Sequence, residues 1–196
     1  MKTDILFTFK KHIESICSLS DTSWNELINI ITFRTLKKDE FIVRENQLYG
    51  NEVFIHTGII RGFYCSETGN VYNVVFYRNG EIVIPCSNRS KNGKSNINLQ
   101  VLSDSEIIEM DQEAFKKLRF KYHDIYVYGN LVQEKELNRK TEREIAMLVK
   151  SAEERYIIFR KEYPNIENSI SQYHVASYLG ITPVSLSRLR KNLISK

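Results

Sequence analysis

The sequence predicts an α+β protein: short N-terminal helices, a β-roll, a long helix and a C-terminal helix-turn-helix. Three observations predict this order. Before residue 35, apolar residues recur every three or four positions, the spacing of an amphipathic helix. Between residues 41 and 110, β-branched and aromatic residues crowd between glycines that are 8 to 13 positions apart, close to the rhythm of strands and turns. After residue 110 the spacing becomes helical again.

The first helix is predicted by the spacing of Ile5, Phe9, Ile13 and Ile16, and a second begins at Asp21-Thr22-Ser23. In the following segment, Thr57-Gly58 and residues 67–70 are typical of turns between paired strands. About 70 residues of such strands fit a closed roll of the jelly-roll or double-stranded β-helix type.

A long helix is predicted from the break at His123-Asp124 to about Lys150, after a shorter helix capped by Asp111. The apolar side chains near its start exceed what one side of a roll needs. We therefore expect a second copy of the chain to pair there, which makes this the dimerisation helix; packing on the chain's own roll is the alternative. The expected interface residues are Tyr122, Ile125, Tyr128, Leu131 and Val132.

The C-terminal segment has the signals of two short helices joined by a tight turn. Ser151 and Glu154 have the spacing of a capping box, which starts a helix at residue 152. Further on, Ser171 can cap one helix and Gly180 can end it with a positive φ. Thr182 then caps the next helix, which begins with a proline.

The positive charge of the chain is concentrated in this segment. The net charge is +4, and residues 170–196 hold four Lys or Arg and no Asp or Glu, so residues 1–169 sum to zero. A basic module on a neutral body is the pattern expected of a protein that binds double-stranded DNA, although a solvated helical hairpin is the alternative. The predicted base-reading residues are Val184, Ser185 and Arg188, and the predicted phosphate contacts are Ser171, Thr182, Ser187 and Lys191.

Composition excludes several classes of protein. With 196 residues, 42% hydrophobic and 27% charged, the chain is expected to fold as a globular protein. It has no membrane-length apolar run and no signal-peptide pattern, so we expect a cytoplasmic protein with no membrane partner. Motifs of common catalytic sites, such as G-x-S-x-G, H-E-x-x-H and C-x-x-C, are missing, so we predict no catalytic residues and no enzyme.

Cysteines and histidines give little support for a cofactor or a metal. Cys17, Cys65 and Cys86 are an odd number without a close pair, which argues against disulfides, zinc and a four-thiolate cluster. We expect buried free thiols. Isolated histidines, as at positions 12, 56 and 123, are usually hydrogen-bonded polar residues rather than haem or metal ligands.

Several segments together resemble the Crp/Fnr family of transcription regulators. They are residues 36–45, residues 54–61, Gly80-Glu81, residues 151–156, residues 176–183 and residues 186–188. The resemblance implies a roll like a cyclic-nucleotide-binding domain with N-terminal helices in residues 1–110, a dimerisation helix in 111–150 and a DNA-binding helix-turn-helix in 151–196. It further implies a homodimer with DNA, RNA polymerase and a small effector as partners.

Two departures from the family pattern affect these expectations. Cyclic-nucleotide binders of the family follow Gly-Glu with an Arg-Ser or Arg-Thr pair, whereas this chain has Ser95-Asn96 at the aligned position. Cyclic AMP is therefore expected to bind poorly, and the effector stays unidentified. The predicted effector pocket comprises Gly80, Glu81, Arg89, Lys94, Ser95 and Asn96. The sequence also stops after the recognition helix, so we expect the β-wing of many relatives to be absent or vestigial.

The alternative function is a ligand-sensing or protein-interaction module of the same fold that does not read DNA. Salt dependence separates the two functions, because DNA binding weakens steeply with ionic strength. The sequence leaves open the operator, the effector and whether binding activates or represses.

Overall fold

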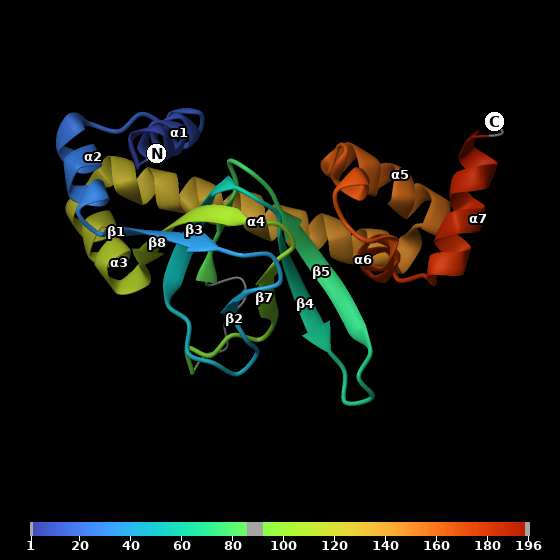
Figure 1. The fold of residues 1–196 in the computed structure, drawn as a ribbon. Helices are drawn as coiled ribbons and strands as arrows, with labels where there is room; N and C mark the ends of the chain where they lie inside the picture. Colours follow the sequence, from blue (N-terminus) through green and yellow to red (C-terminus); the bar gives the residue numbers. More distant parts are fainter. Residues whose placement is uncertain (1, 86–91, 195–196) are drawn as a thin grey trace. The chain divides into compact units, whose positions relative to one another are not determined.

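The computed structural model describes residues 2–85 and 92–194. Its elements follow the predicted order (Figure 1). The helices are α1 (Lys2–Glu14), α2 (Asp21–Ile28), α3 (Gln112–Lys121), α4 (His123–Val149), α5 (Ala152–Glu162), η2 (Ile166–Asn168, a 3-10 turn), α6 (Gln172–Leu179) and α7 (Pro183–Ile194). The strands are β1 (Ile31–Leu36), β2 (Phe41–Val43), β3 (Asn51–Thr57), β4 (Ile60–Cys65), β5 (Val71–Tyr77), β6 (Ile82–Val83), β7 (Asn98–Val101) and β8 (Ser105–Asp111). The α+β class is confirmed.

The strands form two sheets, with orders β1-β8-β3-β6 and β2-β7-β4-β5. In the first sheet β8 lies between β1 and β3 and is antiparallel to both, with Ile108 opposite Phe33 on one side and Phe54 on the other. Strands close in space are thus far apart in sequence, as in a roll. The strands β4 and β5 form a hairpin whose outer strand is β5.

The predicted helix caps and turns are present at positions where a residue's own side chain or a glycine determines the backbone conformation. Asp111 accepts a hydrogen bond from the Ala114 N–H at 2.8 Å and starts α3. Ser151 and Glu154 form both halves of the capping box that starts α5. Gly58 has φ +117°, and a Cβ there would overlap the Ser105 side chain, so only glycine fits this turn.

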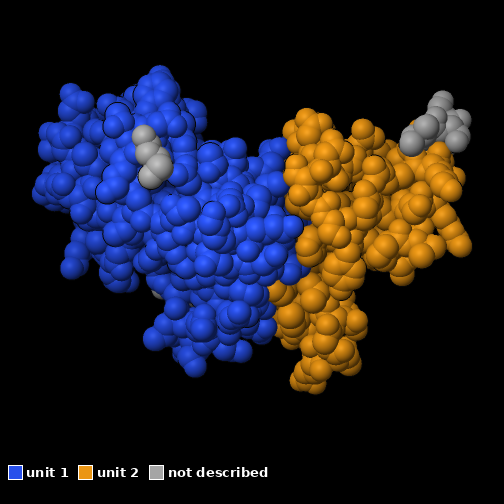
Figure 2. Space-filling model, in the orientation of Figure 1, with its two compact units in different colours: residues 1–62, 76–137 blue, residues 63–75, 138–196 orange. Residues whose placement is uncertain are grey.

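Contacts divide the chain into two compact units (Figure 2). Unit 1 is residues 1–62 and 76–137, and unit 2 is residues 63–75 and 138–196. These units do not coincide with the three predicted segments, because the outer part of the β4–β5 hairpin groups with the C-terminal helices.

Unit 1 has a core of aliphatic and aromatic side chains from its helices and its first sheet. Phe9 of α1 is fully buried, with its ring centroid 5.0 Å from that of Phe54 on β3 and 5.9 Å from that of Trp24. The other core members include Ile5, Ile13, Leu27, Ile108, Met110, Phe115, Ile125, Tyr128 and Val132. The predicted apolar stripe of the first helix therefore faces this core.

Cysteine exposure corrects one expectation. Cys17 is half-buried, but Cys65 at the end of β4 is exposed. Cys86 lies outside the described residues. Within the described part of the chain, no helix combines the length and apolarity that a membrane crossing needs.

Candidate nucleic-acid interface

Helices α6 and α7 form the predicted helix-turn-helix. The Ser171 hydroxyl accepts a hydrogen bond from the Tyr173 N–H at 3.3 Å and starts α6. Gly180 ends that helix with φ +68°, the left-handed conformation that the sequence predicted. Thr182 accepts from the Ser185 N–H at 3.1 Å ahead of Pro183, so both helix starts and the turn follow local sequence signals.

The two helices pack through small and apolar side chains. Ala176 is fully buried, and its size allows a close crossing of the helices; Leu179 and Leu186 are 1% exposed. Behind them, the ring centroid of Tyr178 lies 5.4 Å from that of Phe159 and 5.7 Å from that of Tyr163. Burial raises the pKa of Tyr178 to about 12, with the nearby Glu162 carboxylate adding to the rise.

The outer face of α7 carries the predicted base-reading residues. Val184 is 61% exposed, and Ser185 and Arg188 are also exposed. Arg188 makes no hydrogen bond or ion pair with any described residue, so its guanidinium group is available. The Ser185 hydroxyl lies 2.9 Å from the Thr182 hydroxyl, and both side chains stay exposed.

The predicted phosphate contacts are also on the surface. Ser171 and Thr182 are exposed at the starts of α6 and α7, and Ser187 and Lys191 are exposed along α7. The N-terminal end of a helix and exposed Lys side chains are the groups that proteins commonly direct at phosphates. Their roles in DNA binding stay predictions.

The predicted effector-pocket residues occupy two segments. Gly80 and Glu81 form the turn before β6, where the Glu81 carboxylate accepts from the Arg78 N–H at 3.0 Å and lies 3.6 Å from the Arg78 guanidinium group. Lys94, Ser95 and Asn96 precede β7. Ser95 is buried, and its hydroxyl donates to the Ile97 carbonyl at 2.6 Å. Arg89 lies outside the described residues, and the pocket stays a prediction.

Two polar side-chain contacts in unit 1, one buried and one partly buried, were missed from the sequence. The Tyr77 hydroxyl of β5 donates to the Glu136 carboxylate of α4 at 3.1 Å, and Glu136 is only 7% exposed. The polar run around Glu136 predicts a solvated helix face, so nothing local signals this contact. On β4, Arg61 donates from Nε and Nη2 to the amide oxygen of Gln100 on β7. In the sequence, only the presence of a charged Arg61 within an otherwise apolar strand indicates that this side chain needs a polar partner.

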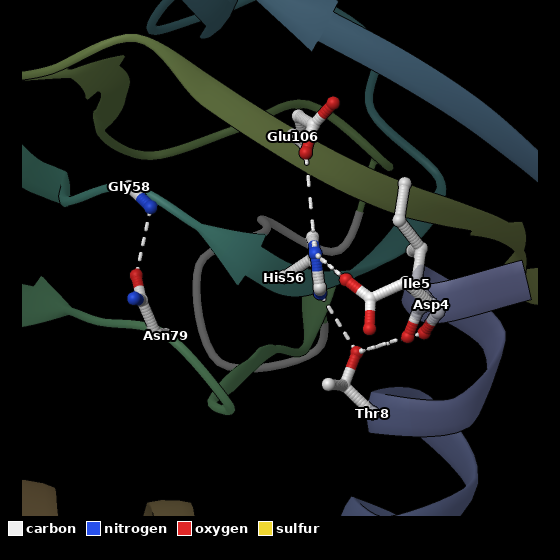
Figure 3. Close-up of polar contacts among 7 residues, drawn as sticks. All are labelled: Asp4, Ile5, Thr8, His56, Gly58, Asn79 and Glu106. Carbon is white, nitrogen blue, oxygen red and sulfur yellow. Dashed lines mark hydrogen bonds and ion pairs between the residues drawn. The ribbon is translucent and has the colours of Figure 1, made fainter. Parts of the chain in front are cut away.

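The ring of His56 in unit 1 has three polar side chains as neighbours. It lies at an irregularity of the β3–β8 pairing, where the register shifts between Ile55 and Thr57. Figure 3 shows Thr8, Asp4 and Glu106 around its ring. The ring Nδ1 lies 2.7 Å from the Thr8 hydroxyl, and Nε2 lies 3.3 Å from Asp4 and 3.9 Å from Glu106. These contacts attach α1 to the sheet, as expected of a structural histidine.

No group of three or more His, Cys, Asp or Glu among the described residues is arranged to hold a metal ion.

The predicted dimer interface needs correction. Ile125, Tyr128 and Val132 are at most 5% exposed and belong to the core of unit 1, so the first half of α4 packs on its own chain. Tyr122 is half-buried against the same core, and Leu131 remains 40% exposed. Apolar spacing identified the buried stripe of the helix correctly but not the partner that covers it.

Comparison with solved structures agrees with this fold, whereas comparison with family models and curated sequences finds no match. FixK2 from Bradyrhizobium japonicum is similar with a TM-score of 0.74 at 18% identity, over 85% of each chain. CLP, the c-di-GMP responsive global regulator of Xanthomonas campestris, has a TM-score of 0.69 at 13% identity, over 90% of this chain and 92% of that chain.

A protein from Eubacterium rectale, assigned to the Crp/Fnr family of transcriptional regulators, has a TM-score of 0.69 at 16% identity. The alignment covers 90% of this chain and 84% of that chain. The β-roll, the long helix α4 and the C-terminal helices therefore give this chain the fold of the Crp/Fnr regulators.

Proposed function

We propose that the protein is a cytoplasmic homodimeric transcription regulator, without enzymatic activity, that binds double-stranded DNA in a sequence-specific way. The observation that carries the proposal is the outer face of α7, where Val184, Ser185 and Arg188 are exposed on the second helix of a helix-turn-helix. No acidic residue occurs in residues 170–196, so this face meets a polyanion without local repulsion. The roll is proposed to sense a small effector.

Each of these side chains suits a different part of the major groove. Arg188 can donate two parallel hydrogen bonds to O6 and N7 of guanine, Ser185 can bond to either kind of base, and Val184 can contact a thymine methyl group. Lys191, one turn beyond Ser187, is placed for a phosphate, which holds the helix in register without selecting sequence.

The proposed dimer uses the side of α4 that faces away from the core of unit 1. Residues two positions apart on a helix lie about 200° apart, so the side chains two positions after the buried Ile125 and Gly129 lie on the opposite side. There the spacing alternates between four and three, which is the heptad spacing of a coiled coil. This heptad face comprises Val127, Leu131, Glu134, Asn138, Thr141, Ile145 and Leu148.

The DNA proposal is tested by selecting duplexes from a random-sequence library with the wild-type protein and then measuring affinities for variants of the selected duplex. Arg188→Ala is expected to remove about 1–3 kcal/mol of discrimination at one base pair, because the Arg188 guanidinium group can donate two hydrogen bonds to guanine. Lys191→Ala is expected to weaken all duplexes alike and to reduce the salt slope by about one per half-site.

The pattern across duplexes decides between the roles. If Arg188→Ala lowers all affinities equally and sequence preference persists, Arg188 contacts a phosphate and the base-reading assignment fails. If the wild-type protein enriches no sequence and shows no salt-dependent binding, the interaction-module alternative replaces the DNA proposal.

The dimer proposal is tested by sedimentation at micromolar protein. The wild type is expected to sediment as a dimer. The double variant Leu131→Glu and Ile145→Glu is expected to sediment as a monomer, because it puts like charges into the heptad face. Leu48→Glu changes an equally apolar side chain that is 77% exposed elsewhere, and it should remain dimeric. A dimeric double variant would show that another surface joins the copies.

A further inference from the structure

The outer edge of β5 is covered by side chains from the C-terminal helices. β5 is the last strand of its sheet, so one side of its backbone has no neighbouring strand. Along a strand, the backbone groups of residues two apart point to the same side, which places those of Val71 and Asn73 together. Both residues belong to unit 2 together with α6 and the second half of α4.

Ser177 of α6 bonds to this edge in both directions. Its hydroxyl donates to the Val71 carbonyl at 2.7 Å and accepts from the Asn73 N–H at 2.9 Å. A hydroxyl can donate and accept at once, so this one side chain replaces part of a missing strand. The Asn73 side chain is 1% exposed and donates to the backbone carbonyl of His174 at 3.1 Å.

Arg143 of α4 joins the same strand to the end of α6. Its Nη2 donates to the Asn73 carbonyl at 3.1 Å and to the Tyr178 carbonyl at 3.0 Å. Its guanidinium carbon lies 4.5 Å from the centroid of the Tyr178 ring, within range of a cation–π contact. Asn73 is thus held through its N–H, its carbonyl and its side chain, by two helices.

We propose that these contacts form a hairpin latch, made of Val71, Asn73, Arg143 and Ser177, that fixes the orientation of the helix-turn-helix and so increases its affinity for DNA. The effect on DNA rests on the proposed function. The latch uses the inner side of α6 and none of the exposed residues of α7, so it can stay closed while α7 contacts bases. A helix pair held in place loses less conformational freedom on binding than a loose one.

Exchange of backbone amide hydrogens in the full chain without DNA tests the latch itself. In Ser177→Ala, the Asn73 amide loses its acceptor and should exchange at least about tenfold faster, as expected when a protecting contact worth one or two hydrogen bonds is lost. Ser169→Ala removes an exposed hydroxyl of the same unit and should leave this amide unchanged. Equal exchange in the wild type and Ser177→Ala overturns the latch, whatever the protein does with DNA.

DNA affinity, measured on the duplex selected by the wild type, tests what the latch does. Ser177→Ala and Asn73→Ala should each weaken binding about fivefold to thirtyfold, the size expected for one or two hydrogen bonds. The double variant should bind like the single variants, because either change opens the same latch. Ser177→Thr retains a hydroxyl and should restore most of the affinity, whereas Ser169→Ala should match the wild type.

The exchange experiment and the affinity experiment together show which of the two proposals fails. Faster exchange with unchanged DNA affinity overturns the positioning role, because the contacts would then be structural only. Additive losses in the double variant overturn it as well, because Ser177 and Asn73 would then act separately. A wild type that binds no duplex refutes the proposed function and the positioning role, while the exchange experiment still decides whether the latch exists.

Discussion

Tyr128 of unit 1 differs in its surroundings from Tyr163 and Tyr178 of unit 2. In unit 1, Tyr128 is completely buried between Phe115 and His12, and its hydroxyl has no hydrogen-bond partner among the described residues. In unit 2, the Tyr163 hydroxyl accepts from Arg139 at 3.2 Å, and the Tyr178 hydroxyl donates to Glu162 at 3.3 Å.

This difference shows how each unit defines its structure. Unit 1 depends largely on apolar area and leaves the buried Tyr128 hydroxyl without a partner among the described residues, at a cost to its stability, although its Tyr77 hydroxyl is bonded to Glu136. Unit 2 is smaller, so it can bury less apolar surface. The hydrogen bonds that the hydroxyls of Tyr163 and Tyr178 make with Arg139 of α4 and Glu162 of α5 are directional. They fix the positions of these helices more sharply than apolar contact alone would.

Among the variants that test this comparison, a substitution of Glu52 should change the free energy of unfolding most. It lies on β3 of unit 1 and is 4% exposed, and burial raises its pKa to about 7, against a smaller opposing effect of Arg119. The folded state therefore holds a proton that the unfolded state loses above about pH 4.5, so this contribution to stability is lost as pH rises through 7. Glu52→Gln should be more stable than wild type by roughly 1–3 kcal/mol at pH 8 and about equal at pH 4.5.

His12 of unit 1 has the opposite pH dependence. Burial lowers its pKa to about 4, and Lys135 adds to this, so its contribution is present above pH 6.5 and lost as pH falls through 4. In Glu52→Gln, stability should therefore rise from pH 4 to 6.5 and then level off. Urea unfolding across this range measures both effects, with the exposed Glu113→Gln as control. A variant less stable than wild type at pH 8 would show that the Glu52 charge stabilises unit 1.

Removing single tyrosine hydroxyl groups tests the difference between the units with smaller changes in the free energy of unfolding. Tyr163→Phe should cost about 0.5–1.5 kcal/mol, because it removes the hydrogen bond between Arg139 and the Tyr163 hydroxyl, whereas Tyr128→Phe should be neutral or slightly stabilising, because it removes a buried group without a partner among the described residues. Equilibrium urea unfolding of the two variants provides the measurement. Equal losses in both would mean that the Tyr128 hydroxyl has a partner and that the units do not differ in this respect.

The elements of the fold could be predicted because their signals are local. The capping box at Ser151, the cap at Asp111 and the turn at Gly180 each depend on residues within a few positions of one another. The exposed face of α7 could be predicted for the same reason, because Val184 and Arg188 share one side of a short helix.

The partners of each surface could not be predicted in the same way. The spacing of Ile125, Tyr128 and Val132 indicates an apolar stripe, but a stripe that packs on the chain's own roll has the same spacing as one that packs on a second copy. Glu136 is buried by a tyrosine 59 positions away, and Ser177 bonds to a strand more than 100 positions away. Such pairs depend on the folded path of the chain.

The path of the β4–β5 hairpin has a consequence for how the chain is made. Ser177 follows Asn73 by 104 residues, so a ribosome that adds about 5–20 residues per second needs about 5–20 s to synthesise the partner of this strand edge. Throughout that time the newly made edge at Val71 and Asn73 has no helix to cover it. Unit 2 therefore stays incomplete until its C-terminal helices have been synthesised, although its first segment, residues 63–75, is made much earlier.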